Sequence, residues 1–75
     1  MDKAEMLKRL ENLGITVFTF AKVSGLSDSW AKSMKHGKRP IQETQVAMLH
    51  ALEAMPVQVR KGFVQTRLIA AGDLS

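Results

Sequence analysis

The sequence predicts an all-α fold, a compact bundle of about five helices in one domain that covers residues 1–75. No stretch alternates apolar and polar residues for long, as a half-buried strand would. Aromatic residues, which favour strands, make up only 5% of the chain. Glycines, prolines and capping residues instead divide the chain into segments of helical length.

The first helix is expected over residues 3–13. Asp2 and Glu5 have the spacing of a capping box, in which each side chain accepts a hydrogen bond from the other residue's backbone N–H. Gly14 is expected to end this helix. The apolar side chains on its inner face are Met6, Leu10 and Leu13.

A second helix is expected over residues 17–24, followed by a tight turn at Gly25. Glycine adopts the positive φ angle that ends a helix, and Ala21 is small enough for another helix to cross closely. Leu26 is then expected to point inward. These residues predict two short helices packed together through a tight turn.

The third helix is expected over residues 28–35, with the Ser27 hydroxyl as its N-terminal cap. Ala31 and Met34 share its buried face, so the opposite face is expected to be exposed. Trp30 either packs beside Ala31 or touches a sugar-phosphate backbone, and packing is the preferred interpretation. The exposed face presents polar side chains that could read base edges, namely Asp28, Ser29, Lys32 and Ser33.

A basic loop follows this helix and ends at Pro40, which cannot continue a helix. Its side chains lie at or beyond the helix end, which favours contact with phosphates over contact with bases. Asp28 has two interpretations, since an acid in the first turn serves either a cytosine amino group or the helix dipole. The residues expected to contact a DNA backbone are Lys22, Ser27, Lys35, His36, Lys38 and Arg39.

Two further helices are expected toward the C-terminus. The fourth runs from Ile41 or Gln42 to Ala54, and its buried residues are expected to be Val46, Leu49 and Leu52. Pro56 opens the fifth, because proline is tolerated in a first turn, and Gly72 is expected to end it.

The fifth helix, over residues 56–72, has two apolar faces with Arg60 and Arg67 between them. A helix of this kind usually contacts two partners. One face would close the core of the domain and the other would form a homodimer interface; alternatively, one set is a partly exposed terminal stripe. The first face comprises Val57, Val64, Leu68 and Ala71. The second, expected to form the interface, comprises Val59, Phe63 and Ala70.

The positive charge lies in the region of the second and third helices. The chain has a net charge of +4, with 11 basic and 7 acidic residues. Residues 17–42 contain five basic residues and one acid, whereas the remainder contains six of each. Such a surface is expected to displace counterions from phosphates, although a solvated basic face is the alternative.

Several classes of protein are disfavoured. The absence of cysteine excludes disulfides and thiolate zinc sites, and fits a reducing cytoplasm. No apolar run approaches the roughly 20 residues of a membrane span, so no membrane association is expected. No catalytic constellation or phosphate-binding glycine loop is present, so we expect no enzyme and no cofactor. His36 and His50 are too far apart in sequence to suggest a metal site.

The spacing of small and apolar residues from Ala21 to Met34, followed by the basic loop, resembles the xenobiotic-response-element family of helix-turn-helix proteins. This family includes temperate-phage repressors and Cro-like regulators, and its fold is lambda-repressor-like. The resemblance covers roughly residues 15–52, with residues 1–14 as the family's first helix. It implies that the helix opening at Ser27 enters the major groove of DNA and that the following loop contacts the DNA backbone.

Two positions depart from the family pattern. The family often has a phosphate-contacting glutamine where Val17 and Phe18 occur; these two side chains are expected to be buried by the first helix or, alternatively, to form a protein contact. The family also tends to have a β-branched residue in place of Ala31, and the neighbouring Trp30 is expected to supply the missing volume.

The expected function is sequence-specific binding of double-stranded DNA by a transcriptional repressor or Cro-like switch protein. A homodimer would occupy an inverted-repeat operator and occlude the promoter. This implies a cytoplasmic, nucleoid-associated protein. One alternative is an antitoxin-like or adaptor module that retains the fold and binds a protein partner; another is nucleic-acid coating without sequence preference.

Overall fold

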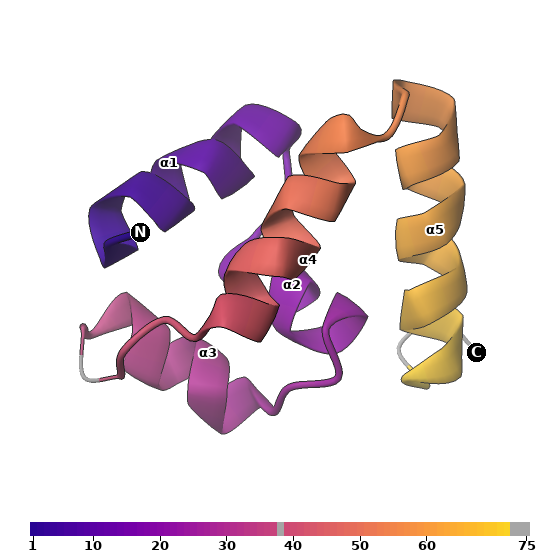
Figure 1. Cartoon of the computed structure of the whole chain (residues 1–75). Coiled ribbons are helices and arrows are strands. Elements are labelled where there is room, and N and C mark those ends of the chain that lie inside the picture. Colours follow the sequence, from indigo (N-terminus) through magenta and orange to yellow (C-terminus); the bar gives the residue numbers. More distant parts are fainter. Residues whose placement is uncertain (38, 73–75) are drawn as a thin grey trace.

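The computed structural model describes residues 1–37 and 39–72, which form five helices and no strand (Figure 1). This confirms the prediction of a compact, all-α bundle. None of the helices in the described residues is both long enough and apolar enough to cross a membrane. The helices are α1 (Lys3–Leu13), α2 (Val17–Val23), α3 (Asp28–Lys35), α4 (Glu43–Ala54) and α5 (Val57–Ala70).

The predicted bounds of α1 and α3 agree with the structure, and the other three helices differ by one or two residues. Helix α2 ends at Val23, and Ser24 is its C-terminal cap. Helix α4 begins after Gln42, whose N–H donates to the Gln45 side chain at 2.9 Å. Helix α5 begins after Pro56.

The start of α1 forms only half of the predicted capping box. The Asp2 carboxylate accepts a hydrogen bond from the Glu5 N–H at 2.8 Å. The Glu5 carboxylate instead pairs with Arg9, four residues later, at 3.0 Å. An ion pair along the helix therefore replaces the reciprocal cap.

Arg9 also joins α1 to α4. Its guanidinium donates two hydrogen bonds to the Glu53 carboxylate, at 2.7 and 2.5 Å, and both side chains are partly buried. The hydrogen bond from Arg9 lowers the pKa of Glu53, against a smaller opposing effect of desolvation. The planar guanidinium fits a carboxylate in this two-bond arrangement, which fixes the relative positions of the helices.

The turn between α2 and α3 has the hydrogen bonds of a Schellman motif. Gly25 has φ +75°, and its N–H donates to the Lys22 carbonyl at 3.2 Å. The Leu26 N–H donates to the Ala21 carbonyl at 2.7 Å. The positive φ angle predicted for Gly25 is therefore present, and it allows α3 to follow α2 after only four residues.

The core lies between α1, α2, α3 and α4. Trp30 is 4% exposed, and its ring centroid lies 6.0 Å from that of Phe20. This confirms the packing interpretation of Trp30. Val46, expected to be buried, is only half-buried. The core residues are Met6, Leu10, Val17, Phe20, Ala21, Trp30, Ala31, Met34, Leu49 and Leu52.

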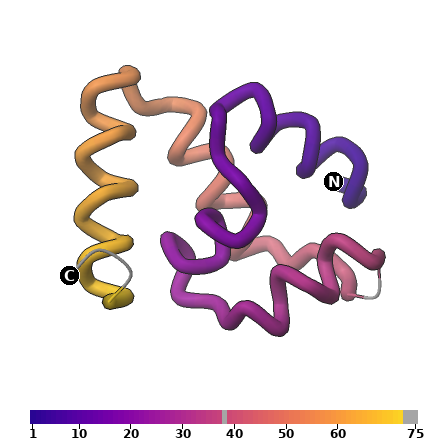
Figure 2. The backbone as a smooth tube through the Cα atoms, turned by 180° about the vertical axis from the view of Figure 1, so that it is seen from behind, coloured from indigo at the N-terminus to yellow at the C-terminus, as the bar shows by residue number. Residues whose placement is uncertain are grey.

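Helix α5 contributes no fully buried residue among those described. It stands at the edge of the fold away from the N-terminus in both views (Figures 1 and 2). Phe63 and Val64 are half-buried and pack against the core. Arg60 donates to the Leu52 and Met55 carbonyls at the end of α4, and Arg67 donates to the Val23 carbonyl at the end of α2. The edge of α5 that carries Arg60 and Arg67 thus faces the rest of the domain.

This arrangement corrects the division of α5 into an inner and an outer apolar face. Phe63, expected at the homodimer interface, already contacts its own core together with Val64. The reason is that Arg60 and Arg67 reach backbone carbonyls of the domain and so turn the edge between the two apolar faces inward. The two apolar faces of α5 therefore lie on either side of its contact with the rest of the domain.

Candidate nucleic-acid interface

Helix α3 is fixed in the fold through one face and exposes the other. The Ser27 hydroxyl accepts a hydrogen bond from the Trp30 N–H at 3.2 Å, which caps the helix as predicted. Trp30, Ala31 and Met34 pack into the core. Of the four candidate base-reading residues, three are exposed and Ser33 is half-buried; the exposed three are Asp28, Ser29 and Lys32.

Asp28 and Lys32 are four residues apart, a spacing at which opposite charges pair along a helix. Among the described residues, however, no ion pair joins them. Both side chains extend from the exposed face of a helix whose opposite face is anchored. The face therefore presents an anion, a hydroxyl and a cation to solvent on a rigid support.

The C-terminal end of α3 is more basic than the local sequence indicates. Lys3, at the start of α1, donates from its Nζ to the Lys35 carbonyl across 3.4 Å. Its Nζ also lies 3.0 Å from the position that a Cβ on Gly37 would occupy. Sequence reasoning missed Lys3, because 32 residues separate it from Lys35. Only the packing of α1 beside α3 reveals the contact.

The remaining candidate backbone contacts surround α3. Lys35, His36 and Arg39 are exposed, and Lys38 lies outside the described residues. Lys22 is half-buried in the last turn of α2. Ser27 is exposed while its hydroxyl caps α3. The candidate backbone-contacting residues that the structure describes thus lie at the two ends of α3 and in the last turn of α2.

Val17 and Phe18 at the start of α2 have different environments. Val17 is 5% exposed and belongs to the core, which confirms the preferred interpretation of burial. Phe18 is half-buried, and the Lys35 ammonium lies 5.6 Å from its ring centroid. A cation at this distance from an aromatic face is attracted to it. Phe18 thus positions the Lys35 side chain.

The expected interface residues on α5 are exposed to different degrees. Val59 is 56% exposed, Ala70 is exposed, and Phe63 is half-buried against the core. Val57 and Ile69 are 53% and 54% exposed. Ile69 was not singled out from the sequence, because its position lies outside the two apolar faces. The fold of the single chain thus leaves these three branched apolar side chains of α5 exposed.

No protein-family model matches this chain, and no curated protein or solved structure matches it either.

Proposed function

We propose that this protein is a sequence-specific, double-stranded DNA-binding regulator of the helix-turn-helix class, acting as a repressor or Cro-like switch protein. The observation that carries the proposal is the asymmetry of α3. One of its faces is locked into the core through Trp30, Ala31 and Met34, and the other presents exposed polar and charged groups beside a basic loop. A cytoplasmic, nucleoid-associated location follows from this function.

The proposed mechanism is occupancy of an operator. Helix α3 enters the major groove, where the Asp28 carboxylate accepts from cytosine and the Lys32 ammonium donates to guanine. Ser29 and the half-buried Ser33 supply hydroxyls at the flanks. Lys35, together with Lys3, neutralises phosphates at the end of the helix. A rigid helix reduces the entropy lost on binding.

The proposal includes a homodimer formed through α5. Val59 and Ile69 are more than half exposed although they are branched and apolar, so a second copy would bury them. Two copies of α3 would then bind the half-sites of an inverted repeat about one helical turn apart. The same exposed residues also favour the alternative function, an antitoxin-like or adaptor module with a different protein partner.

Selection of binding sites from a random duplex pool tests the proposal. Enrichment of an inverted repeat, bound more tightly than a scrambled duplex across salt concentrations, is the expected result. Steep salt dependence without enrichment would favour nonspecific coating. The absence of any binding would favour the adaptor module.

Charge reversal at matched positions sharpens this test. Lys32→Glu on α3 and Lys61→Glu on α5 change the net charge equally, and both side chains are exposed. We expect Lys32→Glu to abolish preference for the selected site, because it places a carboxylate against base edges. Lys61→Glu should retain the preference. Equal losses would contradict readout by α3.

A further inference from the structure

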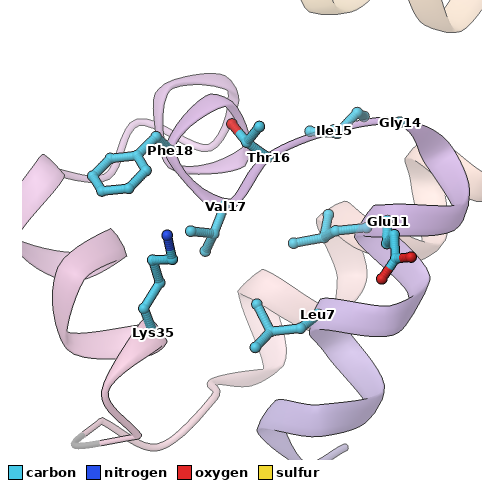
Figure 3. A pocket seen from close by; sticks show the side chains of 9 residues that line it. Leu7, Glu11, Gly14, Ile15, Thr16, Val17, Phe18 and Lys35 are labelled. Carbon is cyan, nitrogen blue, oxygen red and sulfur yellow. The ribbon is translucent and has the colours of Figure 1, made fainter.

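A groove lies between α1, the start of α2 and the end of α3 (Figure 3). Its volume is about 480 Å³, within the range of small-molecule sites. Leu7, Ile15 and Phe18 form apolar walls and are only half-buried, while Val17 belongs to the core beneath. The groove therefore combines apolar surface with access from solvent.

The two ends of the groove have opposite charges. Lys35 supplies the one cation among the described residues that line it, and Figure 3 shows its amine directed toward Phe18 and Val17. No ion pair within the described residues involves Lys35. Glu11, on α1, lines the groove across from it. A bound ligand would thus be oriented by charge as well as by apolar contact.

We propose that this groove binds small amphipathic carboxylates, with the carboxylate paired to the Lys35 ammonium and the apolar tail against Leu7, Ile15 and Phe18. Burial of the tail removes apolar surface from water on both molecules. Glu11 repels a carboxylate and so favours the orientation in which the head group lies at Lys35. A ligand with a cationic head group would have to place it at the opposite end of the groove, near Glu11.

Such a ligand would also affect DNA binding, a consequence that rests on the proposed function. Lys35 is one of the residues assigned to the DNA backbone, and one ammonium cannot pair fully with a phosphate and a carboxylate together. Ligand and DNA therefore compete, and each weakens binding of the other by the same factor. The groove would serve as a site where an amphipathic acid releases the protein from its operator.

Titration of the free protein with decanoate, below the concentration at which it forms micelles, tests the site without DNA. Amide resonances of groove residues should shift and saturate, and neutral decanol should bind more weakly. Lys35→Met keeps the apolar stem and removes the charge, so decanoate affinity should fall about five-fold. Lys32→Met makes the same change one turn earlier, outside the groove, and should leave the affinity unchanged.

Three results would overturn the site. Decanol binding as tightly as decanoate would show that charge plays no part, as expected of a groove for an apolar segment of a partner protein. Groove resonances that respond to protein concentration but not to decanoate would assign the groove to a second copy. Equal effects of Lys35→Met and Lys32→Met would show that decanoate responds to the overall charge.

A second assay measures the affinity for the selected duplex with and without saturating decanoate. A several-fold loss in the wild-type protein, reduced in Lys35→Met, supports competition. Unchanged DNA affinity while decanoate is bound would overturn the competition. Should the protein bind no duplex, the proposed function fails, while the titration of the free protein still decides the site.

Discussion

At the start of α3, two serines that are two positions apart have different surroundings. Both residues are exposed, but it is the Ser27 hydroxyl that caps α3, by accepting a hydrogen bond from the Trp30 N–H. We expect Ser27→Ala to lower the free energy of unfolding by about 1 kcal/mol, because it leaves a backbone donor of the first turn without its cap. Urea denaturation followed by circular dichroism measures the change.

Ser29→Ala is the matched control for this loss of a hydroxyl. It should change stability by less than about 0.5 kcal/mol, because the residue is exposed and outside the cap. Its expected effect is on DNA, through altered preference at one base pair of the selected site. A stability loss equal to that of Ser27→Ala would contradict the capping role.

Glu53 makes the stability of the fold depend on pH. Its folded-state pKa is lowered from the ordinary value of 4.5 by the hydrogen bond from Arg9. The resulting stabilisation is fully present above about pH 4.5 and is lost as pH falls through the folded-state pKa. Glu53→Gln should therefore flatten the decline in stability below pH 4.5.

Thermal melts of the wild type and Glu53→Gln between pH 3 and pH 7 measure this effect. The difference between the two proteins should be largest near neutral pH and amount to about 1 kcal/mol, as for a partly exposed pair. Glu11→Gln removes an exposed carboxylate of α1 and serves as the control. A constant difference across the pH range would contradict the linkage.

At the scale of helices, the sequence predicted the elements whose ends have local signals. Asp2 and Gly14 bound α1, and Ser27 bounds the start of α3, so those limits agree with the structure. Helix α4 is preceded by Gln42, a residue outside the usual capping set, so the sequence defined its start less sharply. Local chemistry thus predicts helix ends when the capping residue is short and polar.

The attachment of α5 could not be predicted in the same way. Periodicity identified its apolar residues, but Arg60 and Arg67 turn the edge between the two apolar faces toward the domain. These arginines reach carbonyls of α4 and α2, and the Arg67 partner is 44 residues away in sequence. Lys3 at the candidate interface likewise reaches a carbonyl, that of Lys35, 32 residues away in sequence. Long cationic side chains reach partners that a helical pattern does not specify.

Helix α5 contains a glycine that the fold of the single chain does not require. A Cβ added to Gly62 would have no heavy atom within 4 Å, and its φ angle is not positive. Since glycine costs about 1 kcal/mol relative to alanine within a helix, Gly62→Ala should raise the free energy of unfolding by about that amount. Chemical denaturation at low protein concentration measures the change in the single chain.

Gly14→Ala provides a control of opposite sign. An added Cβ is equally free of contacts there, but Gly14 has φ +72°, which strains an alanine. We expect this variant to lose about 1 kcal/mol. A gain in both variants would show that α1 rearranges its C-terminal turn, and a loss in both would contradict the open space around Gly62.

At the scale of the whole molecule, the two proposed interfaces lie on different elements. The charge excess belongs to residues 17–42, while α5 stands at the edge of the fold away from the N-terminus (Figures 1 and 2). A second copy on α5 would therefore leave the exposed face of α3 available. The proposed dimer contact and the proposed DNA contact can therefore be tested by separate substitutions.

Val59→Glu should separate the two activities. Val59 is 56% exposed, so the carboxylate is tolerated in the protomer but is expensive to bury against a second copy. Sedimentation should show a shift from dimer to monomer.

Affinity of Val59→Glu for the full inverted repeat should fall about a hundred-fold, because the two half-sites are no longer bound by linked subunits. Its affinity for a single half-site should stay constant. The exposed Asn12→Asp, on α1 and outside both proposed interfaces, introduces the same charge and should leave both measurements unchanged. A loss at the single half-site would instead mean that α5 acts on the fold of α3 and not on assembly.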